Sequence, residues 1–161
     1  MIRFVKNGQP EVVGINTLIL GVGVKSMSLH MRYVRRIITR LLRERIVEHA
    51  GVGLWFDDSK KIPPYFFETN FQMEYPPPEL GVRVLETLKR SPAEEAGIQA
   101  GDLLTKAVVK GRDVLFKNAR ELRELIFFDL RPGDALTLFV KRGAQVLEKT
   151  IKLGDYQELP A

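Results

Sequence analysis

The 161-residue sequence predicts an α+β fold, in which short strands are joined by two short capped helices and preceded by a strand and a long amphipathic helix. Three observations predict it. The run SPAEEAGIQAGDLL, residues 91–104, has the residue order of a capped helix, a glycine turn and a buried strand. Asn118 with Glu121 three residues later forms a capping box for a second helix. Residues 135–140 and 146–153 are expected to form a terminal hairpin.

The first third predicts one strand and one helix. Residues 11–20 (EVVGINTLIL) favour a strand because β-branched and apolar residues dominate them, with Asn7-Gly8 as a turn before it and the glycines of 21–23 at its end. From Ser28 to about His49 the spacing becomes that of an amphipathic helix. Its apolar stripe consists of Val34, Ile37, Ile38, Leu41 and Leu42. Its other face carries Arg32, Arg35, Arg36, Arg40, Arg43 and Arg45.

In the run, Ser91 caps a helix whose first residue is Pro92, where the missing N–H costs no hydrogen bond. Gly97 supplies a left-handed residue at the helix C-terminus. A Gly-Asp turn at residues 101–102 then leads into a strand over residues 103–109.

The remaining elements follow from local patterns. The glycine-containing segment GVGLWF, residues 51–56, predicts a loop that enters a strand, and residues 57–80 form an insertion with five prolines and several aromatic residues. Residues 81–88 alternate as a strand. The helix from Asn118 extends to about Phe128 before an Arg-Pro-Gly-Asp turn.

Composition excludes several classes of site. A chain with 45% hydrophobic and 28% charged residues is typical of a globular protein with a core. The absence of cysteine excludes disulfides and cysteine-based zinc sites, and two histidines exclude histidine-rich metal sites. No apolar window long enough for a membrane span and no basic-then-apolar signal peptide occur. The net charge of the chain is +5, and its positive excess lies in residues 1–49, which carry nine Lys/Arg against three Asp/Glu.

No catalytic residue is predicted. Acyl transfer by serine requires a hydroxyl, an imidazole in reach and a group that orients the imidazole. The candidates are Ser26, Ser28, Ser59, Ser91, His30 and His49, and none lies in the sequence context of a nucleophile. The carboxylate pairs 57–58 and 94–95 are explained by a polar turn and a helix first turn. We therefore expect no catalytic, metal or cofactor site in this chain.

Residues 50–156 resemble the PDZ domain of the HtrA (DegP-like) serine proteases, with residues 157–161 as a tail. The resemblance rests on the run 91–104, Gly81-Val82, Asn118-Ala-Arg-Glu-Leu122, Leu130-Arg-Pro-Gly-Asp134 and the hairpin. It implies a PDZ-like, partly open β-barrel or sandwich capped by two helices, in the circularly permuted order of bacterial relatives. The region 57–80 is then an aromatic and proline-rich insertion in that domain.

Residues 1–49 resemble the C-terminal end of the same family's trypsin-like protease domain, a strand followed by a linker helix. The family's GNSGGP motif would fall at or before Met1, and its histidine and aspartate further upstream, so the catalytic triad is expected to be absent from this chain. The resemblance implies a part of a serine endopeptidase of protein quality control. For a full-length relative it implies the cell envelope or periplasm.

The resemblance implies a peptide-binding module that adds an extended, apolar polypeptide end as a strand and receives its carboxylate on a loop of backbone amides. It assigns binding to Gly51, Val52, Gly53 and Leu54, with Leu122 and Ile126 on the facing helix. The partners implied are polypeptide C-termini or unfolded segments. The alternative for Gly51 to Leu54 is a plain strand start, and for Leu122 and Ile126 a plain core stripe.

A second function class remains open from the residues alone. The arginine face of the first helix favours an adaptor that binds an anionic membrane surface or nucleic acid, although a solvated linker helix has the same pattern. The strand at residues 11–20 has apolar faces that a complete protease domain would cover. A homo-oligomer through the N-terminal segment is therefore a further expectation.

Overall fold

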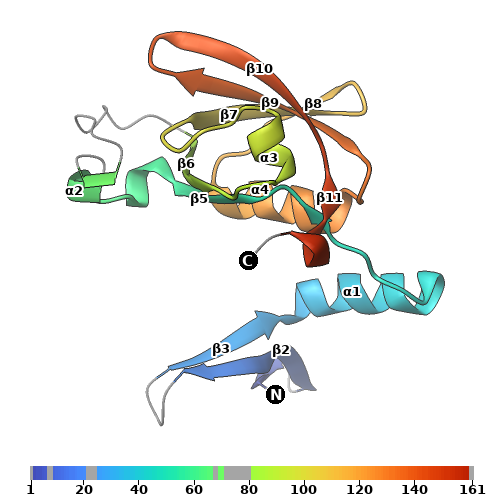
Figure 1. Cartoon of the computed structure of the whole chain (residues 1–161). Coiled ribbons are helices and arrows are strands. Elements are labelled where there is room, and N and C mark those ends of the chain that lie inside the picture. Colours follow the sequence, from blue (N-terminus) through green and yellow to red (C-terminus); the bar gives the residue numbers. More distant parts are fainter. Residues whose placement is uncertain (1, 7–8, 21–24, 67–68, 71–80, 160–161) are drawn as a thin grey trace. The chain divides into compact units, whose positions relative to one another are not determined.

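A computed structural model describes residues 2–6, 9–20, 25–66, 69–70 and 81–159 of the chain (Figure 1). They divide into two compact units, Met1–Val47 and Glu48–Ala161. The predicted turn at Asn7-Gly8, the glycines of 21–23 and half of the insertion at 57–80 (residues 67–68 and 71–80) lie outside the described residues.

The first unit is a three-stranded antiparallel sheet followed by a helix. The strands β1 (Ile2–Lys6), β2 (Gln9–Leu20) and β3 (Lys25–His30) pair in that order. The helix α1 (Met31–Glu44) follows directly. The predicted strand is thus present within β2, while β1 and β3 were not predicted.

The predicted start and end of the long helix were wrong. Residues around Ser28 lie in β3, where backbone pairing with β2 decides their conformation. The helix begins after His30, whose Nδ1 accepts a hydrogen bond from the Arg32 amide at 3.2 Å. It ends at Arg45, a left-handed residue (φ 66°) whose amide donates to the Leu41 carbonyl at 2.9 Å. This left-handed cap stops the helix before His49.

The second unit contains a six-stranded sheet in the order β10-β9-β7-β6-β5, with β8 beside β7. Its strands are β5 (Leu54–Asp58), β6 (Val82–Thr87), β7 (Leu103–Val109), β8 (Arg112–Val114), β9 (Ala135–Arg142) and β10 (Gln145–Lys152). A separate short pair joins β4 (Ala50–Gly51) to β11 (Gly154–Asp155). Among the described residues no strand joins β5 to β10, so the sheet is open, as predicted. The predicted strands and hairpin are present, and β4, β8 and β11 are additional.

The two capped helices are present. In α3 (Pro92–Glu95), Ser91 Oγ accepts from the Glu94 amide at 3.3 Å. In α4 (Ala119–Glu124), Asn118 Oδ1 accepts from the Glu121 amide at 2.9 Å. The Glu121 carboxylate accepts a hydrogen bond from the amide of Lys117, one residue before the cap. A π-helical turn, η3 (Leu125–Asp129), continues α4 to the predicted end.

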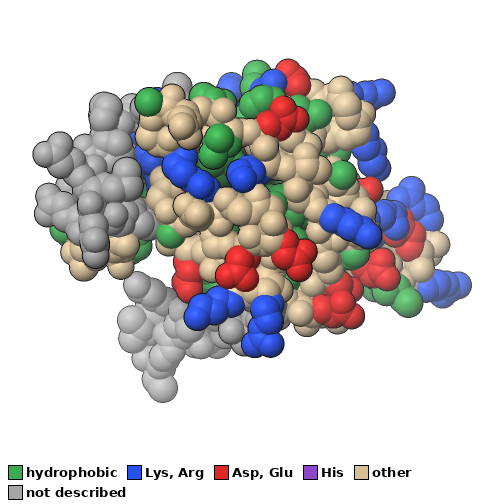
Figure 2. Space-filling model, turned by 45° about the horizontal axis from the view of Figure 1, so that its top comes forward, with side chains coloured by type: hydrophobic (Ala, Val, Ile, Leu, Met, Phe, Trp, Pro, Cys, Tyr) green, Lys and Arg blue, Asp and Glu red, His purple; other side chains and the backbone are tan. Residues whose placement is uncertain are grey.

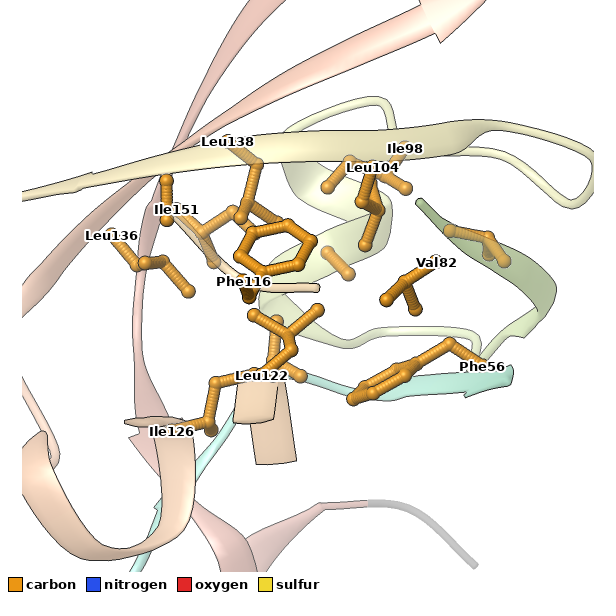
Figure 3. Close-up of a cluster of buried hydrophobic side chains, with 14 of the residues drawn as sticks. Phe56, Val82, Ile98, Leu104, Phe116, Leu122, Ile126, Leu136, Leu138 and Ile151 are labelled. Atoms are coloured by element: carbon orange, nitrogen blue, oxygen red, sulfur yellow. The ribbon is translucent and has the colours of Figure 1, made fainter. Parts of the chain in front are cut away.

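Shorter elements complete the chain: the turns η1 (Ser59–Lys61), α2 (Pro64–Phe66) and η4 (Tyr156–Glu158). The predicted tail overlaps η4, which follows β11 directly. The core lies between the sheet and α4, where Phe56, Leu104, Phe116, Leu122 and Leu138 converge (Figure 3). On the face shown in Figure 2, acidic and basic side chains are interspersed and hydrophobic ones form only separate spots.

Candidate functional site

Strand β5 forms one end of the six-stranded sheet. Its inner edge pairs with β6, while none of the described strands pairs with its outer edge, and α4 contacts β5. Because a strand at the end of a sheet presents free backbone donors and acceptors, this outer edge is the place where another extended chain could add. We call it the β5 edge.

The segment immediately before the β5 edge, Gly51 to Leu54, is fixed by the run 91–104. The Val52 carbonyl accepts a hydrogen bond from the Ala93 amide at 3.0 Å. Gly53 has φ 76°, and a Cβ placed there would lie 2.2 Å from Ser91 Cβ. Only glycine therefore fits at position 53, for both conformation and space.

Gly51 is enclosed by residues near the C-terminal end of the unit. It pairs with Gly154 in β11, and a Cβ on Gly51 would lie 2.7 Å from Leu159 Cδ1 and 2.8 Å from the Tyr156 Cα. Between these two fixed glycines, the amides of Val52 and Gly53 donate to no acceptor in the described part of the chain. Two adjacent unused donors at a strand end are a suitable receptor for a carboxylate.

Side chains alternate along the first half of β5. Leu54 packs against the core and Phe56 is buried in it, whereas Trp55 is 63% exposed on the opposite face. The Gly53 carbonyl bonds the Leu88 amide beside β6. Because backbone groups alternate in direction along a strand, the amide and carbonyl of Leu54 and Phe56 face the outer edge.

Two polar contacts span the space between β5 and α4. Arg123 Nη2 donates to the Phe56 carbonyl at 2.5 Å, and the guanidinium lies 5.0 Å from the centre of the Phe56 ring. Asp58 Oδ1 accepts from the Ala119 amide, and Asp58 Oδ2 lies 2.6 Å from Lys61 Nζ. Although partial burial raises the pKa of Asp58, its bonds to Lys61 and the Ala119 amide outweigh burial and hold it below the usual value.

The facing helix presents its predicted pair to the core. Leu122 is fully buried and Ile126 is 6% exposed, and both belong to the central cluster (Figure 3). The plain core stripe, the alternative stated from the sequence, describes these surroundings. Contact of Leu122 or Ile126 with a ligand stays a prediction. The residue that α4 does place at the β5 edge is Arg123, which the apolar pattern gave no reason to select.

An ion pair between the buried Asp102 and the partly exposed Arg142 was also missed. Asp102, 1% exposed, receives two hydrogen bonds from Arg142 at 2.7 and 2.8 Å and one from the Gln99 amide at 2.9 Å. Arg142 also donates to the Gly97 carbonyl at 2.9 Å. The bonds to Asp102 raise the pKa of the Arg142 guanidinium despite its partial burial. These contacts join the run 91–104 to the terminal hairpin.

The catalytic candidates lie in structural positions. His30 caps α1, and His49 stacks on Phe127 with ring centres 3.7 Å apart. Ser91 is a helix cap and Ser59 is buried in η1, whereas Ser26 and Ser28 lie in β3. In the described ranges no group of three His, Cys, Asp or Glu side chains could hold a metal ion. No helix among them is long and apolar enough to cross a membrane.

An open sheet capped by α3 and α4, with a free edge strand that follows a glycine segment, defines a PDZ-like module. The chain belongs to the PDZ domain family, whose model matches residues 50–153. More particularly, the resemblance to the HtrA serine proteases is confirmed by curated relatives. The Serine protease Do-like HtrB of Bacillus subtilis (strain 168) is 30% identical over 139 residues, 84% of this chain and 30% of that protein. The HtrA of the same organism is 26% identical over 158 residues, 94% and 34% respectively.

The chain thus spans about a third of the length of these relatives. Solved structures share its fold. The HtrA-type protease AlgW with decapeptide superposes with a TM-score of 0.62 at 17% identity, over 89% of this chain and 42% of that one. The serine endoprotease from Yersinia pestis superposes with a TM-score of 0.54 at 18% identity, over 90% and 43%.

Proposed function

We propose that the second unit binds the C-terminal ends of extended polypeptides by strand addition at the β5 edge. The terminal carboxylate is received by the amides of Val52 and Gly53, and the last residue pairs with Leu54. The observation that carries the proposal is that the amides of Val52 and Gly53, immediately before β5, donate to no acceptor among the described residues, and that no described strand pairs with the outer edge of β5. The structural neighbour AlgW was solved with a decapeptide, which supports a peptide as the ligand class.

In the proposal, rigidity of the carboxylate receptor comes from both sides. Ser91 encloses Gly53, while Leu159 encloses Gly51. A receptor that is already ordered loses little conformational entropy on binding, so more of the interaction energy contributes to affinity. The affinity of strand addition comes largely from backbone hydrogen bonds, so extended ends of varied sequence are the expected ligands.

For a full-length relative we propose that this module recognises substrates for a serine endopeptidase. This extension rests on the curated relatives, which are serine proteases. The residues that would cut peptide bonds are not assigned to this chain.

The test uses Trp55, the only tryptophan of the chain, which lies on β5. Ten-residue peptides with an apolar last residue are titrated while tryptophan fluorescence and backbone amide chemical shifts are followed. We expect saturable changes at Trp55 and at the amides of Val52, Gly53 and Leu54. The same peptide with an amidated C-terminus should bind about tenfold more weakly or worse, because a charge-assisted hydrogen bond is lost.

A salt titration separates this function from binding through the arginine face of α1. Phosphate-driven binding weakens steeply with salt, whereas strand addition changes little. Shift changes confined to α1, or equal affinity for the free and amidated peptides, would contradict the proposal.

A further inference from the structure

A cationic side chain, Arg123, occupies the β5 edge. Arg123 donates to the Phe56 carbonyl, an outward acceptor that an added strand would use. Arg123 is exposed, so its guanidinium has room to move away from β5 without disturbing the core. A ligand that pairs with Phe56 must therefore replace this hydrogen bond with its own amide.

The geometry of strand pairing fixes which ligand side chain meets the displaced guanidinium. Residues directly opposite each other in adjacent strands have side chains on the same face of the sheet. Phe56 faces the core and α4, so the ligand residue paired with it also points toward α4 and Arg123. The ligand's last residue pairs with Leu54, so the residue paired with Phe56 is the third from the C-terminus.

The nearby acid does not remove the need for a new partner. Asp58 lies two residues along β5, but its carboxylate is already bound to Lys61 Nζ at 2.6 Å and to the Ala119 amide. A carboxylate on the ligand side chain that points toward α4 can accept charge-assisted hydrogen bonds from the displaced guanidinium, which a neutral side chain there cannot match.

We propose that Arg123 makes the β5 edge selective for polypeptide ends with Asp or Glu at the third residue from the C-terminus. The inference rests on the proposed function, since it requires strand addition. Arg123 thus has two consequences. It weakens binding of ends with a neutral residue at that position, which only displace it, and it favours ends that give it a carboxylate.

The experiment compares three ten-residue peptides on the whole chain at low salt: one with Gln third from the end, one with Glu there, and one with Glu at the penultimate residue. In the third peptide the Glu side chain is paired with Trp55 and faces away from α4, so this peptide serves as a matched control. We expect the Glu peptide to bind about fivefold more tightly than the other two, as for a partly exposed ion pair. High salt should reduce this advantage.

Two variants assign the preference to one side chain. In Arg123→Gln, the advantage of Glu should disappear and the Gln peptide should bind more tightly than it does to the wild type. Arg120→Gln changes the same residue type on the same helix, at an arginine that pairs with Glu124 instead, and should behave as the wild type.

If all three peptides bound to the wild type with equal affinity, this inference would be overturned and the proposed function would still stand. An Arg123→Gln variant that keeps the preference for Glu would have the same consequence. Failure of every peptide to bind both the wild type and Arg123→Gln would overturn the proposed function, and this inference with it. The comparison of peptides on the wild type decides the matter even if the variant does not fold.

Discussion

The two sides of the PDZ unit use the same residue types for opposite purposes. Around the run 91–104, an arginine and an aspartate form a bidentate pair in which Asp102 is 1% exposed. At the β5 edge, Arg123 on α4 donates to the Phe56 carbonyl of β5, and Asp58 on β5 accepts from the Ala119 amide of α4. The first pair connects two permanent elements, whereas Arg123 occupies a position that a ligand strand would take.

The difference indicates which region of a binding module stabilises the fold and which region is left available for a ligand. A buried charge is costly to separate from its partner, so the pair of Asp102 and Arg142 stabilises the run 91–104, which contacts the segment Gly51 to Leu54 through Ser91 and Ala93. A single contact from an exposed arginine contributes little and is exchanged easily. We therefore expect changes in the run 91–104 to affect folding and changes at the β5 edge to affect binding.

The largest effect is expected where the run contacts the receptor segment. Gly53→Ala combines a left-handed residue with a Cβ that would lie 2.2 Å from Ser91 Cβ, so the free energy of unfolding should fall by about 4 kcal/mol. The matched control is Gly143→Ala, at φ 58° with no atom within 4 Å of the new Cβ, which should cost about 1 kcal/mol. Urea unfolding measures both. Equal losses would show that Ser91 does not pack closely against position 53.

The next effect tests the buried pair. Asp102→Asn keeps the size of the side chain but removes the charge that faces Arg142. Because Arg142 is 34% exposed and partly solvated, we expect a loss of about 2–3 kcal/mol rather than that of a fully buried charge. The control Asp113→Asn removes an exposed ion pair with Lys106 and should cost less than about 1 kcal/mol. Similar losses in the two variants would contradict the contrast between the regions.

The smallest effect is on the β5 side and depends on pH. The pKa of Asp58 is lowered in the folded chain, so its carboxylate stabilises the fold above the unfolded pKa of about 4. Asp58→Asn should cost about 1 kcal/mol at neutral pH, and the difference from the wild type should vanish as the pH falls through the folded pKa. Urea unfolding between pH 2 and 7 measures this. A difference independent of pH would mean that the charge of Asp58 is not involved.

Much of the PDZ unit could be predicted because its helix caps and turns require particular residue types at particular positions. Ser91, Gly97 and Asn118 each satisfy a need of the adjacent backbone, and the structure places each in the predicted conformation. The helix start near Ser28 failed because pairing with β2 overrides a weak helical pattern. The Asp102–Arg142 and Phe56–Arg123 contacts join residues 40 and 67 positions apart, so no local spacing could indicate them.

The pairing of β4 with β11 has a practical consequence for protein engineering. Gly51 lies opposite Gly154, so the chain enters and leaves the PDZ unit at one place. A unit with adjacent ends can be inserted into a loop of another protein with little stretching of the host chain. Adjacent ends also favour circular permutation, in which a short linker joins the present termini and new termini are placed at the exposed Gly143-Ala144 turn. Leu159 must be kept in such a variant because it covers Gly51.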